Sequence, residues 1–348
     1  MHAVMALSGT HLSYQQKDNL DVQLATRNHY SLLLKGLRLA FAEEARQPCT
    51  KRSLRLLVIL VVLCHVEAVA GEPHGGIFPH LRASRQLILS LLQKSDVDMD
   101  GDSRRMKGFV LEVYTYLVLA NNITPYGRNE ARTLPLDPFI TSFEMLKEYE
   151  TCGLFFSCGF GLFETIPKIC VFAMNRLAEE EESSSCSAKS QRTYNELVSI
   201  LLGWKSPPVD LEMVEFESAH ISAGEAYRQS LLMFVKSAMC GSVVDNPKVI
   251  TEIQGHIEVM QDAMPVLRIS PFVTVMLWPL MIMGSCLVSP RGRADLMAML
   301  DTSSVDLMQV AQAAKLLRLL WEDTDKRAFG PFGLHLVMQK HNINFSMA

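Results

Sequence analysis

The sequence lacks the patterns that most often mark a catalytic or metal-binding protein. None of its eight cysteines stands in a Cys-x-x-Cys pair, and no His-Glu-x-x-His, Gly-x-Ser-x-Gly or Gly-x-x-x-x-Gly-Lys-Ser/Thr motif occurs. These absences argue against a zinc finger, a zincin metalloprotease, an α/β-hydrolase and a P-loop nucleotide-binding protein. Cysteines scattered through apolar runs are typical of buried thiols in a reducing intracellular compartment rather than of a disulfide framework.

Charge is also sparse, and neither sign dominates. The 348 residues include 33 Lys and Arg against 37 Asp and Glu, which gives a net charge of −4, and no dense basic cluster appears. Because phosphate contacts supply most of the affinity of a DNA-binding surface, we expect no direct nucleic-acid contact from this chain. Hydrophobic residues make up 49% of the chain, which is enough for a large core in one big domain or two.

Long apolar runs are few. The N-terminus has no basic start followed by a continuous apolar core, so no signal peptide is predicted. Leu56–Cys64 is too short to cross a membrane, whereas residues 269–290 are uncharged and long enough. Two internal prolines, Pro271 and Pro279, favour a buried core helix or a broken helix pair there, and we expect no membrane contact.

Apolar residues recur with helical period through most of the chain. One stripe consists of Tyr30, Leu34, Leu37 and Phe41. Helix breakers separate the stripes at 71–76, 121–138, 205–208 and 245–247. Ser304 is a candidate N-cap for a helix near the C-terminus. Period-two alternation is scarce, so the sequence predicts an all-α fold, a large single domain of about 12 to 14 helices in one body or two packed halves.

One stretch is of low complexity. Residues 179–190 read EEEESSSCSAKS, which cannot bury much apolar surface. We expect a mobile loop, or a helix end plus linker, and a candidate hinge between two halves.

The run that most resembles a metal site begins like a calcium-binding loop. Asp96, Asp98 and Asp100 fall at loop positions one, three and five, and Gly101 at six. Position twelve, which should supply a bidentate carboxylate, is Lys107. The sequence therefore favours an acidic, solvated turn between two helices over a calcium site.

The other candidates for chemistry are no stronger. His65 and Glu67 stand two residues apart and would point to different sides of a helix, while His74 and His80 flank a Gly-rich turn. The Gly-rich run at 152–161 is interpreted as a helix break packed by phenylalanines. A cluster near the C-terminal third either lines a ligand pocket or fills the core: Met276, Trp278, Met281 and Met283. No catalytic or metal-binding residue is predicted, and the cofactor-binding residues remain unknown.

Several segments, taken in order, resemble one known family. They are MHAVMALSGTHLS at the start, NHYSLLLKGL at 28–37, the apolar helix and Gly-rich turn of 56–88, LWPLMIMGSCL at 277–287, and the leucine-rich closing pattern of 313–347. Together they are similar to the large helical regulatory domain that follows the zinc binuclear cluster in fungal-specific transcription factors. The resemblance covers roughly residues 1–345, and it is the order and spacing of the segments that carry it.

The resemblance implies a non-enzymatic nuclear protein that regulates RNA polymerase II transcription by binding co-regulators or a small effector, with a homodimer left open. In that family six clustered cysteines upstream hold two zinc ions and recognise DNA, and this chain contains no such cluster. We therefore expect no cofactor in this chain, and Met1 either follows a missing cluster or begins a member that has lost it. The alternative is a free-standing helical small-molecule-binding protein or enzyme with no role in transcription.

Overall fold

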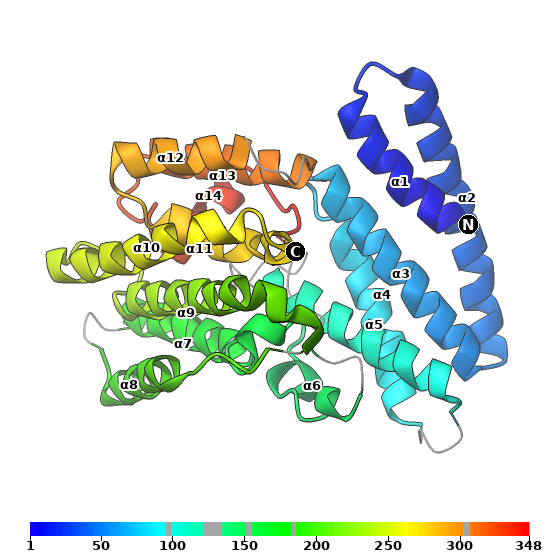
Figure 1. The fold of residues 1–348 in the computed structure, drawn as a ribbon, viewed down its shortest axis with the longest axis horizontal. Helices are drawn as coiled ribbons and strands as arrows, with labels where there is room; N and C mark the ends of the chain where they lie inside the picture. Colours follow the sequence, from blue (N-terminus) through cyan, green and yellow to red (C-terminus); the bar gives the residue numbers. More distant parts are fainter. Residues whose placement is uncertain are drawn as a thin grey trace.

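The computed structural model describes residues 1–94, 99–121, 134–149, 153, 155–182, 186–209, 211–301 and 307–347. Within these ranges all regular structure is helical, which confirms the predicted all-α class (Figure 1). The first six α-helices are α1 (His2–Gln15), α2 (Leu20–Arg46), α3 (Thr50–Ala70), α4 (Ile77–Leu92), α5 (Gly101–Ala120) and α6 (Pro138–Thr141). Those that follow are α7 (Thr165–Glu182), α8 (Ala188–Gly203), α9 (Glu217–Met239), α10 (Pro247–Leu267), α11 (Leu277–Ser285), α12 (Pro290–Asp301), α13 (Met308–Glu322) and α14 (Gly330–Lys340). Short 3-10 helices are η1 (Leu146–Glu148), η2 (Ser157–Gly159), η3 (Leu211–Phe216) and η4 (Pro271–Val275).

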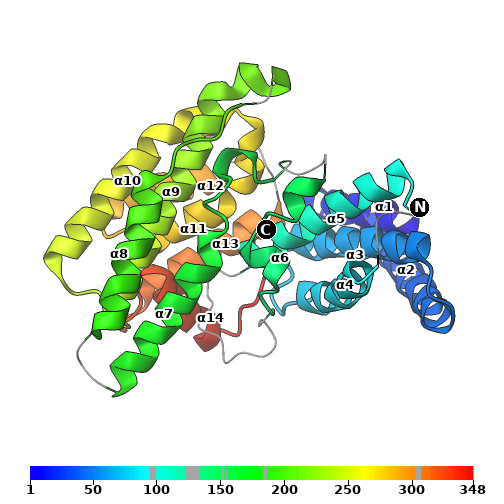
Figure 2. The ribbon, with the colours of Figure 1, turned by 90° about the horizontal axis from the view of Figure 1, so that it is seen from below.

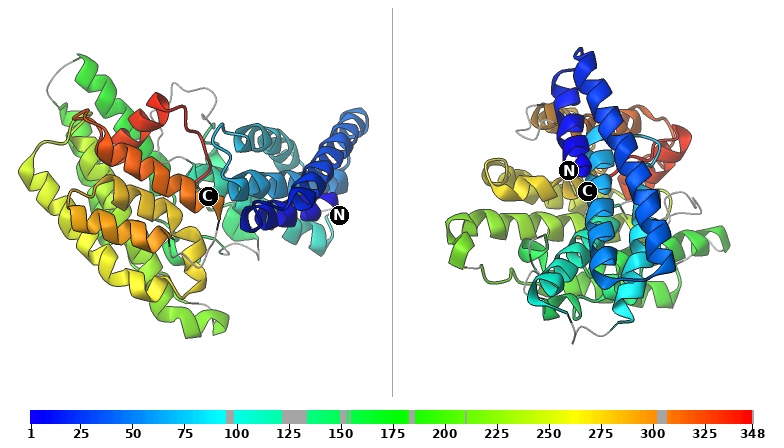
Figure 3. Two further views of the ribbon diagram at one scale, coloured as in Figure 1. Left: turned by 90° about the horizontal axis from the view of Figure 1, so that it is seen from above. Right: turned by 90° about the vertical axis from the view of Figure 1, so that its right-hand side faces the viewer.

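The helices gather in two groups, and the C-terminal segment lies between them (Figures 1 and 2). In the first group, α3 is central and packs against α1, α2, α4 and α5. In the second group, α9 is central and packs against α7, α8, α10, α11 and α14. Figure 3 shows the same division from above, with α1–α5 on one side and α7–α14 on the other.

Helix α3 is long and apolar enough to cross a membrane by length and composition alone, with a mean hydropathy of 2.1. Here 56% of its apolar window is buried inside the fold, against neighbours from both groups, including α13. It ends at Gly71, whose φ of 58° forms a left-handed C-cap that glycine adopts without steric cost. The central helix of a globular core has this same length and composition.

The uncharged run at 269–290 is divided between η4 and α11, as the predicted broken helix pair requires. At 1.5 Å per residue, the nine residues of α11 extend about 14 Å, less than half of the roughly 30 Å of a bilayer core. Trp278 and Met281 of α11 are 1% and 0% exposed, so this helix belongs to the core.

A chain of aromatic rings connects the two groups. Phe156 lies 6.3 Å from Tyr116 of α5 and 4.7 Å from Phe163, centroid to centroid. Phe163 lies 4.5 Å from Tyr227 of α9, which in turn stacks on Trp278 of α11 at 5.8 Å. In its described residues, the Gly-rich run thus is the phenylalanine-packed helix break that the sequence predicts.

The low-complexity segment joins α7 to α8, and residues 183–185 lie outside the described residues. On either side of them, Glu179 accepts hydrogen bonds from the hydroxyls of Ser187 and Ser190 at 2.5 and 2.7 Å. Both α7 and α8 pack against α9. The segment therefore lies within the second group and does not separate the two groups, contrary to the hinge interpretation.

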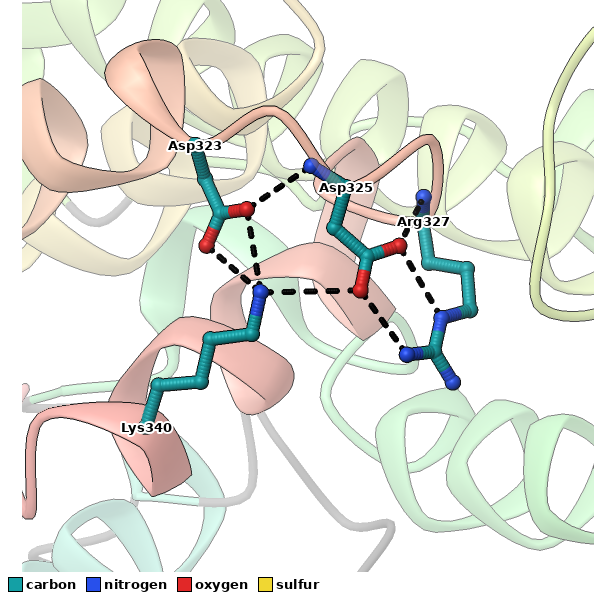
Figure 4. A network of polar contacts seen from close by, with 4 residues as sticks. All are labelled: Asp323, Asp325, Arg327 and Lys340. Atoms are coloured by element: carbon teal, nitrogen blue, oxygen red, sulfur yellow. Dashed lines mark hydrogen bonds and ion pairs between the residues drawn. The ribbon is translucent and has the colours of Figure 1, made fainter.

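A polar network fixes the connection between α13 and α14 (Figure 4). Lys340 donates to both carboxylate oxygens of Asp323 at 3.0 and 2.8 Å, and contacts Asp325 at 3.5 Å. Arg327 binds the Asp325 carboxylate through two nitrogens at 3.0 and 2.8 Å. The last residue of α14 is thus tied to the loop that precedes that helix.

Candidate functional site

Two adjoining cavities of about 460 and 550 Å³ lie between the end of α10, η4, α11 and α12. Volumes in this range suit a small-molecule ligand. The residues that border both cavities are Met264, Pro265, Arg268 and Met299. The first is completed by Leu267, Ile269, Val273, Met276, Leu280 and Leu300, and the second by Gln261, Met283, Ser289, Arg291, Gly292, Asp295 and Leu296. We call the pair the methionine groove.

One wall of the groove is the C-terminal end of α10. Pro265 lies inside this helix and has no N–H to donate to the carbonyl of Gln261, one turn earlier. Two residues on, the helix ends, and the Ser270 hydroxyl donates to the carbonyl of Leu267 at 2.9 Å. Pro271 then opens η4, so the chain turns along the groove instead of continuing the helix.

The facing wall comes from α11 and α12. The indole N–H of Trp321 donates to the carbonyl of Gly284 at 2.9 Å, which fixes the end of α11 against α13. The Ser289 hydroxyl accepts from the N–H of Gly292 at 3.0 Å and caps the start of α12. The Cζ atom of Arg293, on α12, lies 5.3 Å from the Trp321 ring centroid, so Trp321 contacts α12 as well as α11.

The floor of the groove is apolar and rich in methionine. Met264, Met276 and Met283 are 8%, 2% and 2% exposed, whereas Met299 is half-buried. Ile269 stands at the edge with 88% of its surface exposed. Methionine is unbranched and polarisable, so such a floor adapts to ligands of different shape.

Among the described lining residues, charges occur only at the rim of the groove. They are Arg268, which borders both cavities, and Arg291 and Asp295, whose Nε and Oδ2 atoms are 3.9 Å apart on the exposed face of α12. Among the described residues the lining contains no histidine, cysteine or lysine, so none of them pairs a nucleophile with a general base.

The predicted aromatic and methionine cluster divides between groove and core. Met276 and Met283 line the groove, whereas Trp278 and Met281 face the interior of the second group. Helical spacing alone cannot separate these two faces, because all sides of α11 are apolar. The sequence gives no indication that the groove's other lining residues, on α10 and α12, belong to a site. The one unusual feature there is Pro265, a proline inside a helical pattern.

Of the histidines considered from the sequence, the side chains of His65 and His80 have structural partners, whereas His74 is held through its backbone N–H, which donates to the Glu72 carboxylate at 2.8 Å. His65 Nδ1 lies 2.8 Å from the carbonyl of Val61, one turn back in α3. Glu67 points elsewhere, as predicted, and accepts from the Tyr30 hydroxyl at 2.6 Å, with His80 Nε2 at 3.8 Å. Burial alone would raise the pKa of Glu67, but the nearby His80 and the hydrogen bond from Tyr30 together outweigh it and lower that pKa.

The calcium-like run serves as a helix start. Asp96 and Asp98 lie outside the described residues. Asp100 is the N-cap of α5, accepting from the N–H of Ser103 at 2.8 Å, and it pairs with Lys51 of α3 at 2.9 Å. Those bonds lower the pKa of the Asp100 carboxyl to about 2, with the Lys51 contact the largest cause. Ser304, the predicted N-cap of α13, also lies outside the described residues.

Within the described ranges, no group of three or more His, Cys, Asp or Glu side chains is placed to hold a metal ion. Comparison with known families gives one finding: the family described as the fungal specific transcription factor domain matches residues 1–348. Comparison with curated proteins and with solved structures found no match.

Proposed function

The chain belongs to the fungal specific transcription factor domain family, and from this premise we propose that it regulates RNA polymerase II transcription in the nucleus by binding a small apolar effector in the methionine groove. A regulatory role in transcription follows from the family. We propose in addition that an effector binds, that it binds in the methionine groove, and that the regulated transcription is that of RNA polymerase II.

The observation that carries the proposal is the groove itself. It combines a ligand-sized volume, a buried apolar floor and a few charges confined to its rim. This is the usual composition of a small-molecule site, in which apolar area supplies affinity and a few polar groups set orientation. Because the described lining residues include no nucleophile paired with a general base, we propose a receptor rather than an enzyme.

Binding in the groove would act on the packing of the elements that line it. The ligand would contact the end of α10, η4, α11 and α12, which together line the two cavities. A ligand that prefers one packing of these elements shifts the population toward it. The outer surface of α12 would then change with effector occupancy, and that surface is where we place contact with co-regulators.

DNA recognition, in this proposal, is not the task of these 348 residues. A net charge of −4 supports this, as does the lack of clustered cysteines for a zinc binuclear site. We accordingly propose no cofactor for the chain, no direct nucleic-acid contact and no membrane contact.

A second copy of the chain is the protein partner that we propose for α1. This helix contains no Asp, Glu, Lys or Arg, yet it exposes Val4 at 61% and Met5 at 47%. In a two-fold symmetric dimer the same surface of both copies forms the interface. A helix without charged side chains can pack against its own copy there without repulsion between like charges. Light scattering on the purified chain tests this: we expect a dimer that Met5→Glu converts to a monomer, and a monomeric wild type would contradict it.

The test of the proposed function is a reporter assay with the chain fused to an unrelated DNA-binding domain. Met299→Trp fills the groove from α12, and Met174→Trp is the matched control, because Met174 is a 43% exposed methionine on α7 outside the groove. We expect Met299→Trp to change reporter output and to abolish its dependence on growth conditions. Equal output from both variants and the wild type would overturn the proposal.

A further inference from the structure

We propose that residues 343–347 are an intramolecular peptide ligand, a releasable clasp whose binding site is built jointly by the two helix groups. This inference concerns a different site from the methionine groove and does not depend on it. The segment follows α14, has neither helical nor strand structure, and runs back between the groups to a position near the centre of the molecule (Figures 1 and 2).

The backbone of the clasp is bound like that of a recognised peptide. The N–H of Asn344 donates to the carbonyl of Pro73, in the turn between α3 and α4, at 2.6 Å. The N–H of Met347 donates to the side-chain oxygen of Asn121, at the end of α5, at 3.2 Å. The carbonyl of Ser346 accepts from the amide of Gln309, in the first turn of α13, at 3.1 Å.

The side chains of the clasp alternate as in an extended peptide between two receptor faces. The apolar residues Ile343, Phe345 and Met347 are 7%, 0% and 0% exposed. Between them Asn344 and Ser346 are 8% and 3% exposed, and the Ser346 hydroxyl accepts from the Asn121 amide at 3.3 Å. Backbone bonds that hold a peptide while alternate side chains fill apolar positions are a general mode of peptide recognition.

The binding site belongs to both groups of helices. Pro73 and Asn121 come from the first group, whereas Gln309 comes from the second. The segment therefore reaches Asn121, which lies 225 residues before Ser346 in the chain, and brings it into one site with Gln309 of the second group.

The chain turns from α14 into the clasp at His341 and Asn342. Both residues are exposed, and Asn342 has a φ of 50°. The N–H of Ile343 donates to the carbonyl of Met338 in α14 at 2.9 Å. Release of residues 344–347 would remove the bonds to Pro73, Asn121 and Gln309 and leave this bond at the end of α14 in place.

The test is a competition between the clasp in cis and the same peptide in trans. A fluorescein-labelled peptide of residues 341–348 is titrated into the full wild-type chain and into the full chain carrying Phe345→Ser. We expect the peptide to bind the Phe345→Ser chain at least about tenfold more tightly, because the weakened clasp no longer occupies the site. A peptide that carries Phe345→Ser should bind neither chain. The full chain carrying His341→Ala is the control, and it should bind the unaltered peptide as weakly as the wild-type chain does.

Equal peptide affinity for both chains, with Phe345→Ser still helical by circular dichroism, would overturn the proposal. A second variant, Asn121→Ala in the full chain, keeps the test decisive if Phe345→Ser does not fold. Hydrogen exchange should then rise together at 343–347, at the turn near Pro73 and at the start of α13. A rise confined to the end of α5 would also overturn the proposal.

Discussion

The phenolic hydroxyl of Tyr227, on α9, donates a 2.6 Å hydrogen bond to the carbonyl oxygen of Val275, the last residue of η4. Tyr227 is 1% exposed, and burial raises its pKa well above the usual value, so it is a donor at all ordinary pH. Because η4 forms one wall of the methionine groove, this bond fixes that wall to the central helix of the second group.

Tyr227→Phe removes the hydrogen bond while keeping the ring. The buried carbonyl of Val275 then has lost a donor, and we expect the free energy of unfolding to fall by about 1 kcal/mol. Urea denaturation measures this change. We also expect weaker binding of an apolar dye in the groove, because η4 becomes less ordered. Unchanged stability together with unchanged dye affinity would show that this bond does not support the groove wall.

Glu112 should be among the most sensitive positions. Its fully buried carboxylate accepts from the backbone N–H of Phe155 at 2.7 Å and from that of Gly153 at 3.0 and 3.1 Å. Glu112→Ala leaves these donors without their acceptor, and we expect a loss of about 2 to 4 kcal/mol in chemical denaturation. Glu112→Gln keeps one acceptor oxygen and should lose less. A larger loss for Gln than for Ala would contradict this explanation.

The stability of the chain should rise with pH between about 4 and 6.5 in part because of His256. Burial, and secondarily Lys236, lowers its folded-state pKa to about 4 from 6.5. Its Nδ1 lies 2.5 Å from Gln229 Oε1, which must accept because the Gln229 amide nitrogen donates to Glu225. Below pH 6.5 the unfolded chain binds a proton that the folded chain does not, so folding weakens as pH falls to about 4.

His256→Asn retains a donor near Gln229 but does not titrate. The difference in unfolding free energy between this variant and the wild type should therefore depend on pH from about 4 to 6.5 and become constant above that range. Denaturation at several pH values measures it. A difference that is flat across the whole range would mean that His256 titrates equally in both states.

Lys340 should control the titration of Asp323. The Lys340 hydrogen bonds are the largest cause that lowers the pKa of the Asp323 carboxyl. Lys340→Met should return that pKa toward its usual value, as measured by NMR titration of the carboxyl carbon. Because the pair is exposed to solvent, the change should be smaller at high salt. An unaltered Asp323 pKa would show that the network in Figure 4 is not maintained in solution.

Much of the fold was predictable because helical periodicity is a local property. The stripe that contains Leu34 and Leu37, and the breaks near Gly71 and Pro247, coincide with observed helices and helix ends. The division of residues 269–290 followed from prolines, whose effect on a helix is also local.

What could not be predicted depends on contacts between segments far apart in sequence. The hinge interpretation of 179–190 failed because composition reports low apolar content, not which helices pack together, and α7 and α8 both pack against α9. The division of Met276 from Met281 between groove and core depends on where α10 and α12 lie. Asn121 and its hydrogen-bond partner Ser346 lie 225 residues apart, so no sequence window contains both.

The most direct test of the central claim is a titration of the purified chain with anilinonaphthalene sulfonate, an apolar dye with one anionic group. The dye should bind the wild type and Met174→Trp at one saturable site. Met299→Trp should weaken binding about tenfold or more, about 1.4 kcal/mol, because the indole fills the groove. Equal dye affinity for all three proteins, or no saturable binding to the wild type, would contradict the methionine groove as the effector site.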